Sequence, residues 1–314
     1  MMLTGTIAPT DIGWYSFLFQ QRQLEEANFW TPSAHFTFKA SEFSPFFFKL
    51  KSPHNAICGF GFFAQYSALP DWLAWESFGH ANGCATFEEM RTRIRAIRDR
   101  FDYKGSLDAP IGCIIVVNVL FFDEPDWIPQ PTDWAPRNLR PMRYDLEADE
   151  DARVWQACLE RLASRPSAPF QEDILHVAET QPAYGAPVLV RPRLGQGAFR
   201  VAVTDAYQRS CAVTGEHSLP VLEAAHIRPF ALSGPHETRN GLLLRSDLHK
   251  LFDHGYLAVT PDYRVEVSQR LREEYQNGKS YYPLHGQHLI LPAHVKNQPD
   301  PQLLEWHLNE VFRA

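Results

Sequence analysis

The chain has 314 residues, a length typical of about two domains, and its 45% hydrophobic and 21% charged residues are ordinary for a globular protein with real cores. The net charge of −7 excludes binding of nucleic acid through an overall positive field, so such a partner would need local basic patches. The longest apolar runs, such as CIIVVNVLFF, are too short to span a bilayer, so no membrane partner is expected.

The cysteines and the N-terminus indicate a reducing compartment. The five cysteines are odd in number, widely spaced and form no CxxC pair, which is typical of reduced thiols in a cytosolic protein. The first residues lack a charged segment followed by an apolar run, so no signal peptide is expected. We therefore predict a cytoplasmic protein.

Residues 1–145 are rich in aromatic side chains and in strand patterns. The segment 11–22 is predicted to be a helix. The runs 46–51 and 56–66, joined by the turn SPHN, predict a hairpin of buried strands. The β-branched run 111–122 predicts another buried strand.

A second helix is predicted over 86–102, where Thr86 is a suitable N-cap with Glu89 three residues later. Its apolar face contains Met90, Ile94 and Ile97. A basic stripe on the same helix contains Arg91, Arg95 and Arg98. Such a stripe suits either a solvated face or contact with a nucleic-acid backbone.

The middle of the chain contains a predicted domain boundary. The prolines of 126–141 predict a surface loop without regular structure, and the amphipathic segment 149–163 predicts a helix. The stretch that follows is rich in Pro, Gly and polar residues, so we place the boundary at about 165–185. The predicted organisation is a first domain at 1–145, a helix and linker at 146–190, and a last domain at 191–314.

The last block follows the order strand, loop, extended segment, helix. His226 comes after the apolar run LPVLEAA and should end a strand. Ser246 is a fair N-cap for a helix over DLHKLFD, which carries His249 and which His254 and Gly255 would close. The segment YLAVTPDYRVEVS predicts a hairpin with a Pro-Asp turn.

Four segments of this block occur in order: RLGQGAFR, CAVTG, AAHIRPF and NGLLLRSDLHKLFDHG. Over about 193–275 they resemble the HNH endonuclease family, whose pattern is His ending a strand, Asn in a loop, and His on a helix nine residues later. These residues are His226, Asn240 and His249 here. The expected fold class is α+β, with an N-terminal PUA-like β-barrel-type domain and a C-terminal ββα-metal HNH domain.

The chemistry that the resemblance implies suits these residue types. Phosphodiester hydrolysis needs a water activated near neutral pH, for which His is a suitable general base, and a cation that neutralises charge on the phosphate and the leaving 3′ oxygen. By resemblance, His226 is the general base, His249 is a metal ligand, and Asn240 braces the loop so that His226 points correctly. The implied cofactor is one divalent ion, Mg²⁺ or Mn²⁺.

Two features depart from the family pattern. Many members bind a structural zinc through two CxxC pairs, but the equivalent positions here are Cys211, Thr214, Arg245 and Leu248, so no structural zinc is expected. Members also often carry a metal ligand just before the first His, where this chain has Ala225. Glu223 lies on the same side of the predicted strand and is a candidate metal ligand in its place. Asp253 is interpreted as a structural acid at the helix end.

The N-terminal order of short strand, helix and aromatic hairpin is similar to the PUA-like group of barrels, which includes the EVE and SRA modified-base readers. Such readers stack an extracted base between aromatic side chains. The candidate pocket residues are Trp30, Phe36, Trp72, Trp75 and Phe78, with burial in the core as the alternative for each. The candidate nucleic-acid contacts elsewhere are Arg191, Arg193, Arg200, Arg209 and Arg228, with a solvated face as the alternative.

The leading interpretation is a metal-dependent endonuclease that acts on double-stranded DNA and whose first domain selects modified bases, as in a modification-dependent restriction enzyme. Two alternatives stay open: a nonspecific nuclease toxin and a catalytically silent DNA-binding protein. Double-strand cutting with one active site per chain is compatible with a homodimer.

Overall fold

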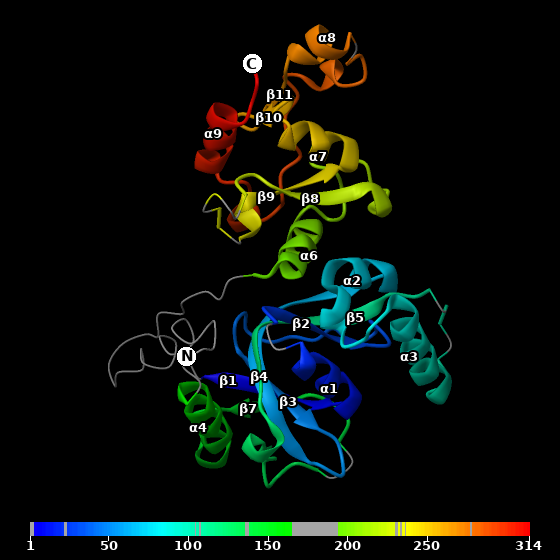
Figure 1. Cartoon of the computed structure of the whole chain (residues 1–314), viewed down its shortest axis with the longest axis vertical. Coiled ribbons are helices and arrows are strands. Elements are labelled where there is room, and N and C mark those ends of the chain that lie inside the picture. The colour runs from blue at the N-terminus through cyan, green and yellow to red at the C-terminus, as the bar shows by residue number, and fades with distance from the viewer. Residues whose placement is uncertain are drawn as a thin grey trace. The chain divides into compact units, whose positions relative to one another are not determined.

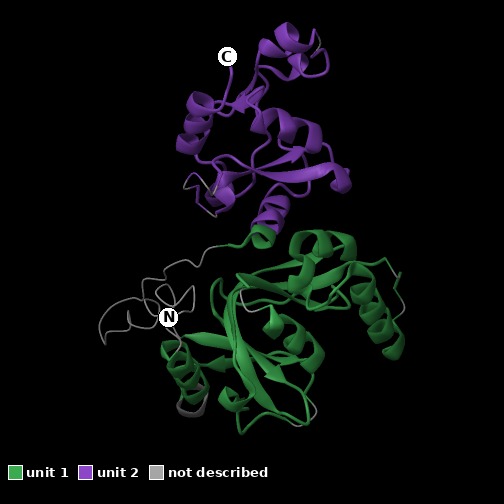
Figure 2. Cartoon of the chain, in the orientation of Figure 1, with its two compact units in different colours: residues 1–198 green, residues 199–314 purple. Residues whose placement is uncertain are grey.

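The computed structural model describes residues 3–21, 24–103, 105–106, 108–135, 138–164, 194–229, 232, 234–235, 237–276 and 278–314. The chain divides into two compact units, residues 1–198 and 199–314 (Figure 2). The predicted boundary region and two candidate DNA contacts, Arg191 and Arg193, lie outside the described residues. None of the helices in the described ranges is both long and apolar enough to cross a membrane.

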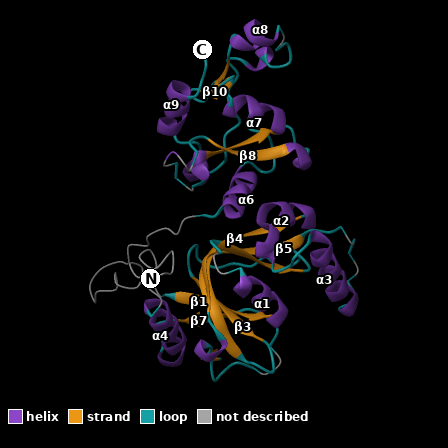
Figure 3. Ribbon diagram, viewed as in Figure 1, coloured by secondary structure: helices purple, strands orange, loops and turns teal. Residues whose placement is uncertain are grey.

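The N-terminal unit contains an α+β arrangement built on one sheet (Figures 1 and 3). Its strands are β1 (Thr4–Thr10), β2 (Glu26–Thr31), β3 (Pro45–Leu50), β4 (Ala56–Leu69), β5 (Ile111–Phe121), β6 (Ile128–Pro129) and β7 (Met142–Asp145). Its helices are α1 (Ile12–Gln20), α2 (Asp71–Phe78), α3 (Phe87–Arg100) and α4 (Asp149–Ala163), with short 3-10 turns η1 (Gly79–Asn82) and η2 (Glu124–Asp126).

The strand order of this sheet is β2-β5-β4-β3-β1-β7, with β6 paired to β4. β1 runs parallel to β3, and the other neighbours are antiparallel. In the described part of the chain the order ends at β2 on one side and β7 on the other, so no closed barrel is found and the expected barrel-type arrangement is not confirmed. The predicted buried strands at 46–51, 56–66 and 111–122 are confirmed as β3, β4 and β5.

Two helices cover opposite faces of the sheet and explain the continuous apolar runs. Side chains alternate along a strand, so neighbouring aromatic residues of β3 point to opposite faces. Phe48 packs against Trp14 of α1 with ring centroids 5.3 Å apart, whereas Phe47 lies 6.0 Å from Trp155 of α4. Because both faces are buried, alternation with polar residues is absent from β3. Helix α4, predicted at 149–163, is therefore part of this unit's core.

Helix α3 confirms the predicted cap but corrects the predicted basic stripe. The Thr86 side chain accepts a hydrogen bond from the Glu89 amide, as its N-cap position requires. Arg98 is buried and donates to the carbonyl oxygens of Pro32 and Ala109. Its guanidinium makes hydrogen bonds to loop carbonyl groups. The three arginines therefore do not form a solvent-facing basic surface for nucleic acid.

The proline-rich segment 126–141 is more ordered than the sequence predicted. It contains the short strand β6, whose Ile128 is buried and pairs with Ile57 of β4. Trp134 is also buried, and its ring stacks on that of Tyr144 with centroids 6.5 Å apart. Proline is tolerated here because β6 is a two-residue strand off the main path of the sheet.

The C-terminal unit contains two small strand pairs and several helices. Its elements are α6 (Gln196–Ala206, which begins in the last residues of the first unit), η3 (Leu219–Val221), β8 (Leu222–His226), η5 (Thr238–Asn240), β9 (Gly241–Arg245), α7 (Ser246–Asp253), β10 (Leu257–Val259), β11 (Val265–Val267), α8 (Arg270–Tyr275), η6 (Tyr282–Leu284), η7 (Val295–Asn297) and α9 (Pro301–Glu310). The predicted hairpin after residue 255 is confirmed as β10 and β11.

The start of α7 differs from the prediction. Ser246 is the first helical residue, and the N-cap is Arg245, whose side chain makes no capping hydrogen bond. The helix follows β9 without a linker, so the last strand residue has to occupy the cap position. The predicted C-terminal end is confirmed, because His254 is the C-cap and Gly255 follows with φ of +75°.

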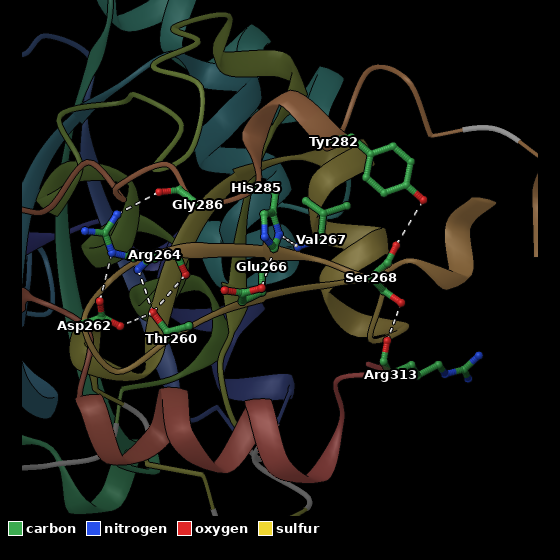
Figure 4. A network of polar contacts seen from close by, with 10 residues as sticks. All are labelled: Thr260, Asp262, Arg264, Glu266, Val267, Ser268, Tyr282, His285, Gly286 and Arg313. Atoms are coloured by element: carbon green, nitrogen blue, oxygen red, sulfur yellow. Dashed lines mark hydrogen bonds and ion pairs between the residues drawn. The ribbon is translucent and has the colours of Figure 1, made fainter. Parts of the chain in front are cut away.

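Polar contacts bind the β10–β11 hairpin to the segment after α8 (Figure 4). Arg264 reaches Asp262 within the hairpin and donates to the Gly286 carbonyl. His285 Nδ1 accepts a hydrogen bond from the Val267 amide at 3.3 Å. Residues 282–288 therefore cover the hairpin as an irregular extension.

Candidate active site

Strands β8 and β9 pair antiparallel and lead directly into α7, which forms a strand-strand-helix unit. The register places His226 opposite Gly241 and Leu222 opposite Arg245. The end of β8 therefore lies beside the start of β9, next to Asn240. Leu242, Leu243 and Leu244 are buried, which shows that both faces of the pair are covered.

Asn240 ties the chain after His226 to the turn before β9. Its side chain is fully buried; Oδ1 accepts from the Arg228 amide, and Nδ2 donates to the carbonyl oxygens of Arg228 and Pro235, each at 2.9 Å. The Asn240 carbonyl also accepts from the Ile227 amide at 2.9 Å. An amide side chain is needed here, because it offers both a donor group and an acceptor in one plane.

The His226 ring lies against helix α6. It stacks on the Phe199 ring with centroids 3.8 Å apart and an interplanar angle of 10°. The close approach of α6 requires glycine opposite His226, because a Cβ on Gly241 would lie 2.4 Å from a methyl group of Val203. Stacking on a ring of helix α6 limits rotation of the imidazole.

His249 of α7 meets a carboxylate at each ring nitrogen. Nδ1 lies 2.7 Å from Glu223 Oε2, a hydrogen bond that links α7 to β8. Nε2 lies 3.3 Å from Oδ2 of Asp253, one helical turn further along α7. The His249 side chain is 21% exposed, while those of Glu223 and Asp253 are 44% and 56% exposed, so solvent reaches the carboxylates.

The structure thus brings together some of the predicted site residues. Glu223 and His249 are in contact, and Asn240 holds the segment that follows His226. Alternation along β8 directs Glu223 and His226 to opposite faces, which agrees with their contacts on α7 and α6 respectively. Sequence reasoning did not include Asp253 in the site, although its i,i+4 spacing from His249 on a predicted helix was a usable signal.

The side chains around His249 could hold a divalent ion only if that ion needs few ligands from the protein. Among the described residues, no three His, Cys, Asp or Glu side chains form a group that could hold a metal ion. Mg²⁺-type sites need only one or two carboxylates, because water and substrate phosphate complete the shell. A site with His249 and one neighbouring carboxylate meets that requirement.

Helix α7 is held in place from its far side by α9. His307 is buried, stacks on Phe252 with ring centroids 3.7 Å apart, and donates from Nε2 to the Phe252 carbonyl at 3.1 Å. Burial lowers the pKa of His307 to about 4. Its Nδ1 is buried without a hydrogen-bond partner among the described residues. A proton added to Nδ1 would therefore have no acceptor for a hydrogen bond.

The positions equivalent to the family's zinc ligands form a different cluster. Cys211 and Leu248 are buried. Arg245 donates to both carboxylate oxygens of Asp247, at 3.0 and 2.6 Å. These hydrogen bonds hold the pKa of Asp247 below its usual range. The cluster thus combines apolar packing with an ion pair at the start of α7.

The candidate DNA-contacting arginines in the described part of the chain differ in the contacts that their side chains make within the protein. Arg228 lies over the Trp306 ring at 5.0 Å and donates to the Leu232 carbonyl, so its side chain folds back onto the protein. Arg209 lies 3.8 Å from Asp205, and Arg200 is on α6.

The aromatic candidates of the N-terminal unit also differ. Trp30 and Trp75 are half-buried, and both border η1, since Trp30 donates to the Asn82 carbonyl and Trp75 lies 6.3 Å from His80. Trp72 is half-buried, and Phe36 is 80% exposed. Phe78 of α2 is buried.

The strand pair, the buried Asn and the His on the following helix occur in the order that the resemblance to the HNH family predicted. Residues 211–260 match the family model described as HNH endonuclease. The matched segment contains His226, Asn240 and His249, and the C-terminal unit therefore carries an HNH endonuclease domain.

Several solved structures are similar to parts of the chain, whereas no curated protein matches it. One is the modification-dependent restriction endonuclease TagI, at 26% identity and a TM-score of 0.27, over 38% of this chain and 39% of that chain. Another is ASCH from Zymomonas mobilis, at 8% identity and a TM-score of 0.30, over 49% of this chain and 94% of that chain. A mutant form of ASCH gives a TM-score of 0.31 and 8% identity over 49% of this chain and 96% of that chain.

Proposed function

We propose that this protein is a metal-dependent DNA endonuclease of the restriction type, with catalysis in the C-terminal unit. The observation that carries the proposal is the HNH match at 211–260, within which Asn240 fixes the segment after His226 through three side-chain hydrogen bonds. That bracing is the role an HNH centre needs from its Asn, since the general base must be held in one orientation.

In the proposed reaction His226 takes a proton from a water molecule whose oxygen forms a bond to phosphorus. The bond between phosphorus and the 3′ oxygen breaks, and the leaving 3′ oxygen takes up a proton from solvent. The stack on Phe199 holds the His226 ring during this step. When bound beside His249, a divalent ion, Mg²⁺ or Mn²⁺, supplies charge neutralisation at the phosphate. A neighbouring carboxylate on β8 or α7 completes the protein's share of the ligands.

We further propose that the N-terminal unit selects the DNA and reads a modified base, with the chain acting as a dimer for double-strand cutting. The half-buried indoles of Trp30 and Trp75, both beside η1, support the reader role. Aromatic faces can stack on an extracted base in a sequence-tolerant way. Phosphate contacts from Arg200 and Arg209 of the other unit are the proposed source of nonspecific affinity.

The test is cleavage of matched plasmids, unmodified or carrying 5-methyl- or 5-hydroxymethylcytosine, with Mg²⁺ or Mn²⁺. We expect cutting of modified DNA that falls at least 100-fold in His226→Ala and is unchanged in His217→Ala, an exposed histidine of the same unit. Equal cutting of all plasmids would retain the nuclease and reject the reader. Full activity in His226→Ala would reject the base assignment, and no cutting by the wild type would favour a silent DNA-binding protein.

A further inference from the structure

We propose that Arg228 binds a phosphate group of the DNA backbone beside the bond that is cut, and that Trp306 of α9 is a positioning residue that orients the Arg228 guanidinium for this contact. The inference rests on the proposed function and deepens it, because it names a group of the substrate and the side chains that hold it. Arg228 is a candidate DNA contact in the sequence, whereas no sequence pattern indicates a role for Trp306.

The backbone of Arg228 is fixed close to the proposed general base. Its amide donates to Asn240 Oδ1 and its carbonyl oxygen accepts from Asn240 Nδ2, both at 2.9 Å. Gly234 packs so closely against the same carbonyl oxygen that a Cβ on Gly234 would collide with it. Since Arg228 lies two residues after His226, the two Cα atoms are at most about 7 Å apart. The Arg228 side chain therefore begins near the phosphate on which His226 is proposed to act.

The guanidinium of Arg228 is held from two sides. Its central carbon, Cζ, lies 5.0 Å from the centroid of the Trp306 ring, a cation–π contact, and Nε donates to the Leu232 carbonyl oxygen at 2.7 Å. With the other described residues, neither Nη1 nor Nη2 forms a hydrogen bond or an ion pair. These two nitrogens carry four of the five N–H donors of the guanidinium. Their planar arrangement matches two oxygens of one phosphate group.

Solvent, and hence a phosphate, can reach this guanidinium. Arg228 and Trp306 are both half-buried, and Leu232 is 52% exposed. Asp300, the N-cap of α9, is paired with Arg239 at 3.0 Å, so its charge is already compensated. A side chain that is oriented before binding loses less conformational freedom when its ligand arrives. The stack on Trp306 should therefore increase the affinity of Arg228 for a phosphate.

Substitution of Arg228 tests its side chain alone. Asn240 contacts only backbone atoms of residue 228, so Arg228→Gln leaves these hydrogen bonds in place. The variant should therefore fold, which thermal denaturation of the full-length protein checks. A change in DNA binding can then be assigned to the loss of the guanidinium.

The first test measures binding of the full-length protein to an unmodified DNA duplex by fluorescence anisotropy, in EDTA to prevent metal-dependent cleavage. Over about 50 to 200 mM salt, we expect Arg228→Gln to raise the Kd about 10-fold and to lower the slope of log K against log salt by about one, because one phosphate contact is lost. Arg270→Gln is the matched control, because Arg270 is an exposed arginine of the same unit whose Nε also donates to a backbone carbonyl. It should change neither value.

The second test applies the same binding assay to Trp306. Trp306→Leu removes the ring and should raise the Kd about 3-fold, whereas Trp306→Phe retains an aromatic face and should restore most of the affinity. In the Arg228→Gln background, Trp306→Leu should have no further effect, because the ring acts through the guanidinium. A purely structural role of Trp306 would give the same loss in both backgrounds.

The outcomes separate this inference from the proposed function. An unchanged Kd and salt slope in folded Arg228→Gln, equal changes in Arg270→Gln, or no binding of the duplex by the wild type would overturn the phosphate contact. Equal losses from Trp306→Leu with and without Arg228 would overturn the positioning role. The expected changes in binding, together with no cleavage of any DNA, would support the phosphate contact and reject the nuclease activity instead.

Discussion

Asn240 holds together the chain that leaves β8 and the turn that precedes β9. It is fully buried, and all three of its side-chain hydrogen bonds go to backbone groups of the segment between β8 and β9. Removal of the amide leaves the Arg228 amide and two carbonyl oxygens without their partner, and each unsatisfied buried group costs about 1–3 kcal/mol.

We therefore expect Asn240→Ala to lower the free energy of unfolding by about 3 kcal/mol and to slow cleavage at least 10-fold under conditions where the variant is folded. Urea denaturation and cleavage kinetics measure the two effects. Asn138→Ala is the control, because Asn138 makes the same pair of hydrogen bonds with Arg140 at an exposed turn. Equal losses in both variants would show that burial at Asn240 is unimportant.

At the scale of elements, the position of α7 depends on its packing against α9. His307 reaches across from α9 to the Phe252 ring and carbonyl, and its pKa is lowered to about 4 by burial. Above about pH 6.5 this residue is neutral in both the folded and the unfolded chain, so its full contribution to stability is present. Between pH 6.5 and 4 the unfolded chain takes up a proton that the folded chain resists, and stability falls.

The expected size of this loss is about 3 kcal/mol between pH 7 and 4. His307→Phe retains the stack on Phe252 but has no imidazole to take up a proton. Between pH 7 and 4, its free energy of unfolding should therefore fall by about 3 kcal/mol less than that of the wild type. Urea denaturation at each pH measures the difference between the two proteins. Parallel pH profiles would mean that His307 is not kept neutral in the folded state.

In the whole molecule, we propose that one unit selects the DNA and the other cuts it. Trp75→Ala should then reduce the preference for modified over unmodified plasmid about 10-fold, because base stacking on an aromatic ring contributes about 1–3 kcal/mol, and leave cutting of unmodified DNA unchanged. Competition cleavage with the two plasmids measures the ratio. Phe101→Ala is the control, since Phe101 is 65% exposed in the same unit and borders a different helix end. A matching loss in this control would point to a general effect of surface aromatic residues.

Much of the local structure was predictable because its signals are short-range. Thr86 with Glu89 predicted the start of α3, and Gly255 predicted the end of α7. The spacing of His226, Asn240 and His249 predicted the HNH segment that the family model matches. Arg245, in contrast, became the N-cap in place of Ser246, because the direct junction of β9 and α7 depends on how both elements pack.

Most helices and strands, and the segment that matches the HNH family model, could be predicted from the sequence alone, because periodicity, caps and motif spacing act over a few neighbouring residues. Only the tertiary structure decided which atoms meet. It buried Arg98 beneath two loop carbonyls, packed Trp155 against Phe47, and placed Glu223 on one nitrogen of His249 with Asp253 beside the other. These contacts join residues from separate elements, and their distances depend on packing that no local pattern encodes.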